Sequence, residues 1–153
     1  HALKIAKTNN VTTILNPAPA ATLDKEIFPL IDYFTPNETE ASFYIDGEIN
    51  TVEDAKKYAT QILDLGIKNA LITLGEKGVY FANKDQEYFI EALKLKNEVV
   101  DTTGAGDLFA AGFLYGITHQ KSYEESGRLA SIAASEIVSH FGARPQVKLS
   151  KLI

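Results

Sequence analysis

The sequence predicts an α/β fold in three layers, with a mainly parallel sheet that helices cover on both faces. Three observations support this prediction. Short apolar, β-branched runs alternate along the chain with segments of helical periodicity, which is typical of strands joined by crossover helices. Hydrophobic residues make up 45% of the chain and charged residues 23%, as in globular proteins. The 153 residues suffice for one core, so we expect a single domain over residues 1–153.

The first two strands are predicted from short apolar runs. Residues 11–15 (VTTIL) are β-branched and apolar and end at Asn-Pro, which is typical of a buried strand. Residues 32–35 (DYFT) resemble a second, shorter strand. Thr35 and Glu38 then stand three apart, in the spacing of a capping box, with Pro36 at the first helical position. A helix capped by Thr35 and starting at Pro36 is therefore expected.

A longer helix and three more strands follow. Residues 51–65 carry apolar side chains at helical spacing, and Gly66 supplies a C-terminal stop. Residues 69–74 (NALITL) read as a strand. Residues 78–82 and 87–92 suggest a further pair of strands that a short polar turn joins.

The C-terminal third predicts two long helices. They cover residues 105–117 and 123–139, and the second is rich in Ala and Ile, which indicates burial. Strands in the first part and helices throughout complete the α/β pattern. Repeats, low-complexity tracts and linkers are absent from the sequence.

Composition excludes several classes of protein. The net charge is -5, and Lys and Arg are dispersed along the chain with only Lys56 and Lys57 adjacent, so we expect no nucleic-acid partner. Apolar runs stay far short of the roughly 20 residues that a membrane helix needs, so we expect no membrane partner. The chain has no cysteine, which excludes disulfides and thiolate metal sites, and it has no secretory signal pattern, so a cytoplasmic location is expected. Because the chain begins with His1 and lacks Met, we expect a piece of a longer protein or an engineered chain.

The stretch 101–113 (DTTGAGDLFAAGF) is the main functional signal. It contains no GxxxxGK[ST] motif, and the third glycine of GxGxxG would fall on Phe109. Gly104, Ala105 and Gly106 would open a helix whose free amides and dipole favour an anion such as a phosphate. Asp107 then has two readings: a favourable first-turn acid, or a carboxylate that accepts a proton from an alcohol attacking the phosphate. The residues alone leave both readings open.

The stretch resembles the C-terminal signature of the ribokinase-like carbohydrate and nucleoside kinases, the PfkB family. Three more segments resemble the family in the same order: LNPAPA (15–20), TPNETEA (35–41) and ITLGEKGVYF (72–81). The resemblance implies a ribokinase-like domain that corresponds to the C-terminal half of the family, without the N-terminal half that bears the lid. Its implied activity is transfer of a phosphoryl group from ATP to a hydroxymethyl group of a sugar.

The resemblance also implies roles for individual residues. Asp107 matches the catalytic base, and Gly104, Ala105 and Gly106 match the anion hole. Asn37 and Glu40 match the pair that organises Mg²⁺ and the phosphate waters, although the residues alone favour ordinary polar residues of a first helical turn. The residues that match positions of the nucleotide loop are Thr73, Gly75 and Gly78. The residues that match a site for a monovalent cation such as K⁺ are Asp101 and Thr103, with carbonyls near Ile137, His140 and Gly142.

The acceptor and the activity of the chain by itself stay open. LNPAPA resembles ribokinases, whereas GAGDLFAAGF and HFGARPQ are closer to adenosine-kinase-like sugar kinases. Family members are about twice this length, and their N-terminal half supplies most of the substrate pocket. The alternative is therefore a nucleotide-binding or structural fragment, or a chimera, without kinase activity of its own. An α/β half without its neighbour would expose apolar surface, so we expect a homo-oligomer.

Overall fold

The computed structural model describes residues 1–93, 98–148 and 151. The chain divides into two compact units, His1–Phe89 and Ile90–Ile153, and each is described by itself.

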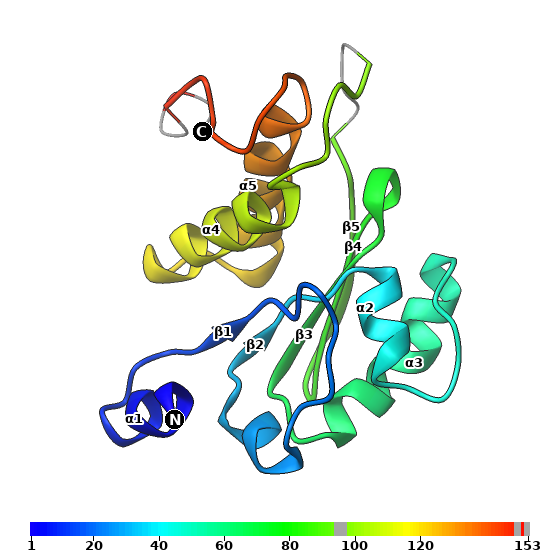
Figure 1. Ribbon diagram of the computed structural model, residues 1–153, viewed down its shortest axis with the longest axis vertical. Helices are drawn as coiled ribbons and strands as arrows, with labels where there is room; N and C mark the ends of the chain where they lie inside the picture. The colour runs from blue at the N-terminus through cyan, green and yellow to red at the C-terminus, as the bar shows by residue number, and fades with distance from the viewer. Residues whose placement is uncertain (94–97, 149–150, 152–153) are drawn as a thin grey trace. The chain divides into compact units, whose positions relative to one another are not determined.

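A five-stranded sheet organises the first unit (Figure 1). Its strands follow chain order: β1 (Ile14–Leu15), β2 (Tyr33–Phe34), β3 (Asn69–Thr73), β4 (Gly78–Asn83) and β5 (Glu87–Glu91). β1 pairs with β2 and β2 with β3 in parallel, whereas β3 pairs with β4 in antiparallel register, with Leu71 opposite Phe81. The α/β class is thus confirmed, and the sheet is mixed: parallel through its first three strands and antiparallel where β4 returns.

Two helices of the first unit pack on this sheet. α3 (Val52–Asp64) contacts β3 and β4, and α2 (Glu38–Phe43) contacts β3. α3 begins where the sequence predicts, because the side chain of Thr51 accepts from the Asp54 amide and the Asp54 carboxylate accepts from the Thr51 amide. The chain leaves the helix at Gly66, whose φ of 104° suits glycine.

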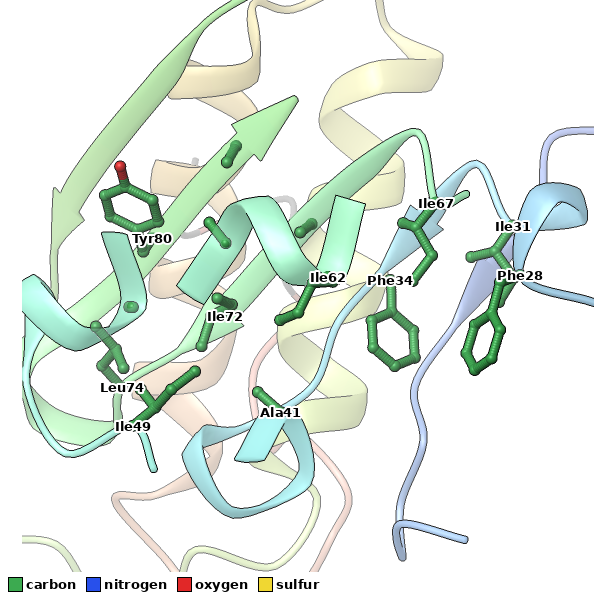
Figure 2. Packing of buried hydrophobic residues seen from close by; sticks show 14 residues of the cluster. Phe28, Ile31, Phe34, Ala41, Ile49, Ile62, Ile67, Ile72, Leu74 and Tyr80 are labelled. Carbon is green, nitrogen blue, oxygen red and sulfur yellow. The ribbon is translucent and has the colours of Figure 1, made fainter. Parts of the chain in front are cut away.

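One hydrophobic cluster forms the core of this unit (Figure 2). Phe34 and Ile62 are fully buried within it, and the ring of Phe34 meets Tyr44 edge-on at 5.5 Å between centroids. The members of the cluster are Phe28, Ile31, Phe34, Ala41, Ile49, Ala55, Ala59, Ile62, Ile67, Ala70, Ile72, Leu74, Tyr80 and Ala82. They come from β2, β3, β4 and the helices, so the core fixes the strands against α2 and α3.

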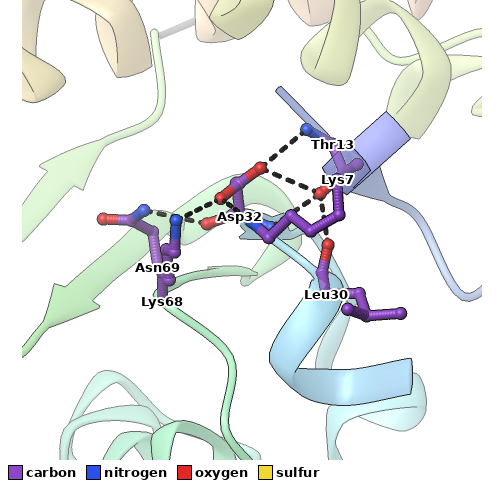
Figure 3. Close-up of polar contacts among 6 residues, drawn as sticks. All are labelled: Lys7, Thr13, Leu30, Asp32, Lys68 and Asn69. Atoms are coloured by element: carbon purple, nitrogen blue, oxygen red, sulfur yellow. Dashed lines mark hydrogen bonds and ion pairs between the residues drawn. The ribbon is translucent and has the colours of Figure 1, made fainter. Parts of the chain in front are cut away.

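A carboxylate with several donors lies beside the start of β2 (Figure 3). Asp32 Oδ1 is 2.7 Å from Lys7 Nζ and 2.6 Å from Lys68 Nζ, while its Oδ2 accepts from the Thr13 amide at 3.0 Å. Burial would by itself raise the pKa of Asp32, but the hydrogen bonds from Lys68, Lys7 and Thr13 outweigh it and hold the pKa well below the usual range. The cluster ties three segments distant in sequence to the start of β2.

Two helices dominate the second unit. α4 (Ala105–Thr118) and α5 (Tyr123–Ile137) lie side by side in close contact. A Cβ placed on Gly112 would lie 2.8 Å from Ala130 Cα, and one placed on Gly116 would lie 2.4 Å from Ser126 Oγ. Gly112 and Gly116 therefore allow the two helix backbones to approach more closely than any larger residue would.

The structure corrects one predicted helix start, shortens two predicted elements and adds short helices that the sequence did not predict. The helix expected to start at Pro36 begins at Glu38, because the Thr35 amide bonds to Leu15 O at 2.9 Å as part of the sheet. The expected strand 11–15 is limited to Ile14–Leu15, and the expected helix 123–139 ends at Ile137. α1 (Ala2–Thr8) and the 3-10 helix η1 (Lys25–Leu30) were not anticipated. No helix in the described part of the chain has the length and apolar character to cross a membrane.

Candidate functional site

Asn37 and Glu40 hold each other at the start of α2. Asn37 Oδ1 accepts from the Glu40 amide at 2.8 Å, and Glu40 Oε2 accepts from the Asn37 amide at 2.9 Å. They form the capping box that the sequence suggested for Thr35 and Glu38. Asn37 is exposed, and Glu40 Oε1 takes no part in the box. The pair is thus a structural cap whose oxygen atoms lie in one helical turn.

Thr73 and the glycine turn lie next to this cap. Asn37 forms a parallel bridge with Thr73 at the ends of β2 and β3, and the Thr73 amide donates to Pro36 O at 2.9 Å. Gly75 opens the short 3-10 helix η2 (Gly75–Lys77) at a φ of 53°, and a Cβ there would lie 3.8 Å from Glu38 Oε1. Gly78, at a φ of 130°, closes the turn, since its carbonyl accepts from Leu74 N at 2.8 Å. The five predicted residues of this unit therefore gather at one edge of the sheet.

In the second unit, Gly104 caps α4 without a side chain. It has the left-handed φ of 83° and ψ of 0°, and no side chain bonds to the start of this helix. Gly106 and Asp107 are exposed in the first turn. Backbone amides at such an end carry partial positive charge and point out of the helix. The turn therefore has the geometry of an anion site, with the Asp107 carboxylate within the same turn.

Asp101 links the segment before α4 to the segment after α5. Its Oδ1 accepts from Thr103 N at 2.9 Å and Thr103 Oγ1 at 2.7 Å, and its Oδ2 accepts from Gly142 N at 3.1 Å. The bonds from the Thr103 hydroxyl, the Thr103 amide and the Gly142 amide lower the pKa of Asp101 below its usual range. Three of the residues predicted for a monovalent cation are thus connected, since Thr103 and Gly142 both bond to Asp101.

The other two predicted cation residues flank a buried carboxylate. Ile137 ends α5 and is fully buried, and His140 Nε2 lies 3.2 Å from Glu136 Oε1. In the described ranges 1–93 and 98–148 and at residue 151, no three His, Asp or Glu side chains gather in a way that could hold a metal ion. A cation at this place would therefore depend on backbone carbonyls.

Glu136 is a residue that sequence reasoning missed. Its side chain is 7% exposed, and it accepts hydrogen bonds from Gln146 N and Val147 N. The signal was present in the sequence as a single carboxylate inside the apolar run IAASEIV, four residues before His140. A charge is seldom buried in a helix without a partner, so the pattern could have prompted a search for one.

A family model covers nearly all of the chain. The model for the pfkB family of carbohydrate kinases matches residues 1–149. The chain belongs to the pfkB carbohydrate kinase family. The resemblance of DTTGAGDLFAAGF to this family is thereby confirmed.

Individual pfkB relatives agree with this assignment. The chain is 40% identical to a ribokinase of Haemophilus influenzae over 146 residues, which is 95% of this chain and 47% of the relative. It is similar to the crystal structure of a Thermotoga maritima ribokinase, with a TM-score of 0.82 and 37% identity over 99% of this chain and 52% of that one. An Arabidopsis thaliana ribokinase solved with ribose and ATP gives a TM-score of 0.83 and 33% identity over 92% of this chain and 46% of that one. The chain spans about half the length of the curated relatives it matches.

Proposed function

We propose that this pfkB chain carries the nucleotide-binding and proton-accepting residues of an ATP-dependent sugar kinase that acts on a hydroxymethyl group of ribose or a related sugar. The observation that carries the proposal is the start of α4, where uncapped amides and Asp107 occupy one helical turn. The similarity to ribokinases, one of them solved with ribose and ATP, supports the nucleotide and the class of acceptor.

The phosphates of ATP fit the start of α4 by charge and by shape. The amides of Gly104, Gly106 and Asp107 supply donors at the positive end of the dipole, whereas the Ala105 amide already bonds to Thr102 O. Gly104 and Gly106 present no side chain to an approaching phosphate. ATP would supply the phosphoryl group that is transferred. In the other unit, the glycine turn at Gly75 and Gly78 is proposed to contact the nucleotide.

Asp107 is proposed to act on the acceptor hydroxyl. The hydroxyl oxygen forms the new bond to phosphorus as the bond to the leaving phosphate oxygen breaks, and the hydroxyl proton passes to the Asp107 carboxylate. In a loose transition state this proton leaves late, so the carboxylate mainly orients the hydroxyl. The amides at the helix start stabilise the charge on the phosphoryl oxygens.

The cations are part of the same proposal. Asn37 and Glu40 offer oxygen atoms, which Mg²⁺ prefers, but each already commits one oxygen to the cap, so contact through water suits them better than direct ligation. Mg²⁺ would neutralise phosphate charge. The residues proposed for K⁺ are Asp101, Thr103, Ile137, His140 and Gly142. Because the Gly142 amide already bonds to Asp101, its carbonyl would be the ligand.

The experiment compares nucleotide binding with turnover in the same variants. Gly106→Leu should abolish the binding of ATP and ADP in calorimetry, because its side chain fills the phosphate approach. Asp107→Asn should leave nucleotide affinity nearly unchanged and lower sugar phosphorylation by about 10²–10⁴-fold. Glu53→Gln, an exposed first-turn acid on α3, is the matched control and should change neither.

Three outcomes separate the readings. Unchanged nucleotide binding in Gly106→Leu would show that the phosphates do not lie at the start of α4. Turnover that survives Asp107→Asn would remove its role as proton acceptor. A wild-type chain that binds nucleotide but phosphorylates no sugar would favour the alternative, a nucleotide-binding fragment without kinase activity of its own.

A further inference from the structure

Glu136 is a buried carboxylate for which the proposed chemistry has no use. Its side chain is 7% exposed and sits near the end of α5, between apolar stretches of that helix. Burying a carboxylate costs free energy unless other groups donate hydrogen bonds to it. Its partners should therefore show what this residue does.

The described hydrogen-bond partners of the Glu136 carboxylate belong to the segment that leaves α5. Its Oε1 accepts from Gln146 N at 2.8 Å and from Val147 N at 3.2 Å, and lies 3.2 Å from His140 Nε2. One oxygen atom thus holds both ends of residues 140–147, and the residues of this segment are exposed from residue 141 onward. The second oxygen, Oε2, is buried and has no hydrogen-bond partner among the described residues.

The middle of residues 140–147 lies against the turn that opens α4. The Gly142 amide donates to Asp101 Oδ2 at 3.1 Å. A Cβ on Gly104 would lie 3.0 Å from Ala143 Cβ and 3.2 Å from Ala143 Cα, so only glycine fits this approach without displacing the segment. The position of the segment therefore constrains the backbone of the turn that opens α4.

We propose that Glu136 is a positioning residue, which fixes residues 140–147 against the Gly104 turn and thereby holds the amides at the start of α4 ready for a nucleotide phosphate. The second half of this statement depends on the proposed function. A leucine would fill the same volume in α5, but it offers no acceptor to the amides of Gln146 and Val147.

The experiment uses a graded series at this position. Glu136→Leu removes the acceptor, Glu136→Gln keeps a neutral oxygen, and Glu124→Gln is the control, an exposed acid on the same helix that pairs with Arg128. Amide hydrogen exchange at Gln146 and Val147 reports the anchor without any ligand, calorimetry with ADP reports the phosphate site, and urea unfolding reports global stability.

Glu136→Leu should speed exchange at both amides by about tenfold or more, because it removes their charged acceptor. The Kd for ADP should rise by a similar factor, about tenfold, since the free turn samples more conformations. Glu136→Gln should give about threefold changes, as a neutral acceptor makes weaker hydrogen bonds. The urea midpoint should change little, because exposed amides can bond to water, and the control should match the wild type.

Several results would overturn the proposal. Exchange at the wild-type rate in both Glu136 variants would show that the carboxylate does not anchor the segment. Faster exchange with an unchanged Kd for ADP would show that the segment does not shape the phosphate site. If Glu136→Leu does not fold, the Glu136→Gln comparison decides on the same criteria. A wild-type chain that binds no ADP would overturn the proposed function and the nucleotide half of this proposal, while exchange still decides the anchor.

Discussion

Two glycines of the second unit provide a sharp test of the packing at the start of α4. Gly104 and Gly142 both have positive φ, 83° and 93°, where side chains are strained. Their surroundings differ: a Cβ on Gly104 would lie 3.0 Å from Ala143 Cβ, whereas a Cβ on Gly142 would have no atom within 4 Å. Alanine at Gly142 therefore measures backbone strain alone, and alanine at Gly104 measures strain together with the contact.

The two costs can be worked out separately. A left-handed conformation costs an alanine about 1–2 kcal/mol, and this applies to both positions. A forced contact at 3.0 Å adds about 1 kcal/mol, the lower end of the cost of overpacking, because Ala143 lies in an exposed segment and can shift by a few tenths of an ångström. We expect Gly104→Ala to lower the free energy of unfolding by about 2–3 kcal/mol and Gly142→Ala by about 1–2 kcal/mol.

Urea unfolding followed by circular dichroism measures the difference. With a typical dependence on urea of about 2 kcal/mol per molar, the midpoint should fall by about 1–1.5 M for Gly104→Ala and by about 0.5–1 M for Gly142→Ala. Equal shifts would refute the reasoning, because they would mean that residues 140–147 do not press on the Gly104 turn. The proposed role of Glu136 would then lose its structural basis as well.

Three further predictions concern stability and assembly. Asp32→Asn should lower the free energy of unfolding in urea by about 1.5–3 kcal/mol, since it removes a charged hydrogen-bond acceptor. Because the pKa of Asp32 is depressed in the folded state, the stabilisation by this carboxylate is complete above the unfolded pKa of about 4 and is lost as the pH falls below that value. The variant should lack this loss of stability in acid. Gly112→Ala should lower the thermal midpoint, because a Cβ that lies 2.8 Å from Ala130 Cα costs about 1–3 kcal/mol, whereas the better helix propensity of alanine offsets about 1 kcal/mol. An unchanged midpoint would show that α4 packs more loosely on α5. Light scattering should find a dimer or larger oligomer, and a monomer at high concentration would contradict the prediction from exposed apolar surface.

The helix starts show how far local sequence information reaches. Thr51 and Asp54 form the capping box of α3 within one turn, and the sequence placed that helix correctly. At α2 two candidate pairs overlap, Thr35 with Glu38 and Asn37 with Glu40, and both satisfy the same spacing. The second pair is used because the Thr35 amide is already bonded to Leu15 in the neighbouring strand. That bond depends on the path of the chain.

The same distinction applies to α1. A seven-residue helix is too short to be stable on its own propensity. It is held by the ion pair between Lys7 and Asp32, which are 25 residues apart, and by packing of Leu3 on the core. The local sequence of residues 1–10 carries no sign of either contact.

By itself, the sequence determined the α/β class, the long helices, the glycine turn before α4 and the family to which the chain belongs. These follow from periodicity, from capping and from the backbone freedom of glycine, all of which act within a few residues. The tertiary structure alone decided which pair caps α2, that Thr73 lies beside Asn37, and that Asp101 holds Gly142 across 41 positions of the chain. It also decided that Glu136, a single carboxylate in an apolar stretch of α5, accepts hydrogen bonds from amides of the segment that follows this helix. Contacts between residues far apart in the chain depend on where folding brings them, and no local pattern carries that information.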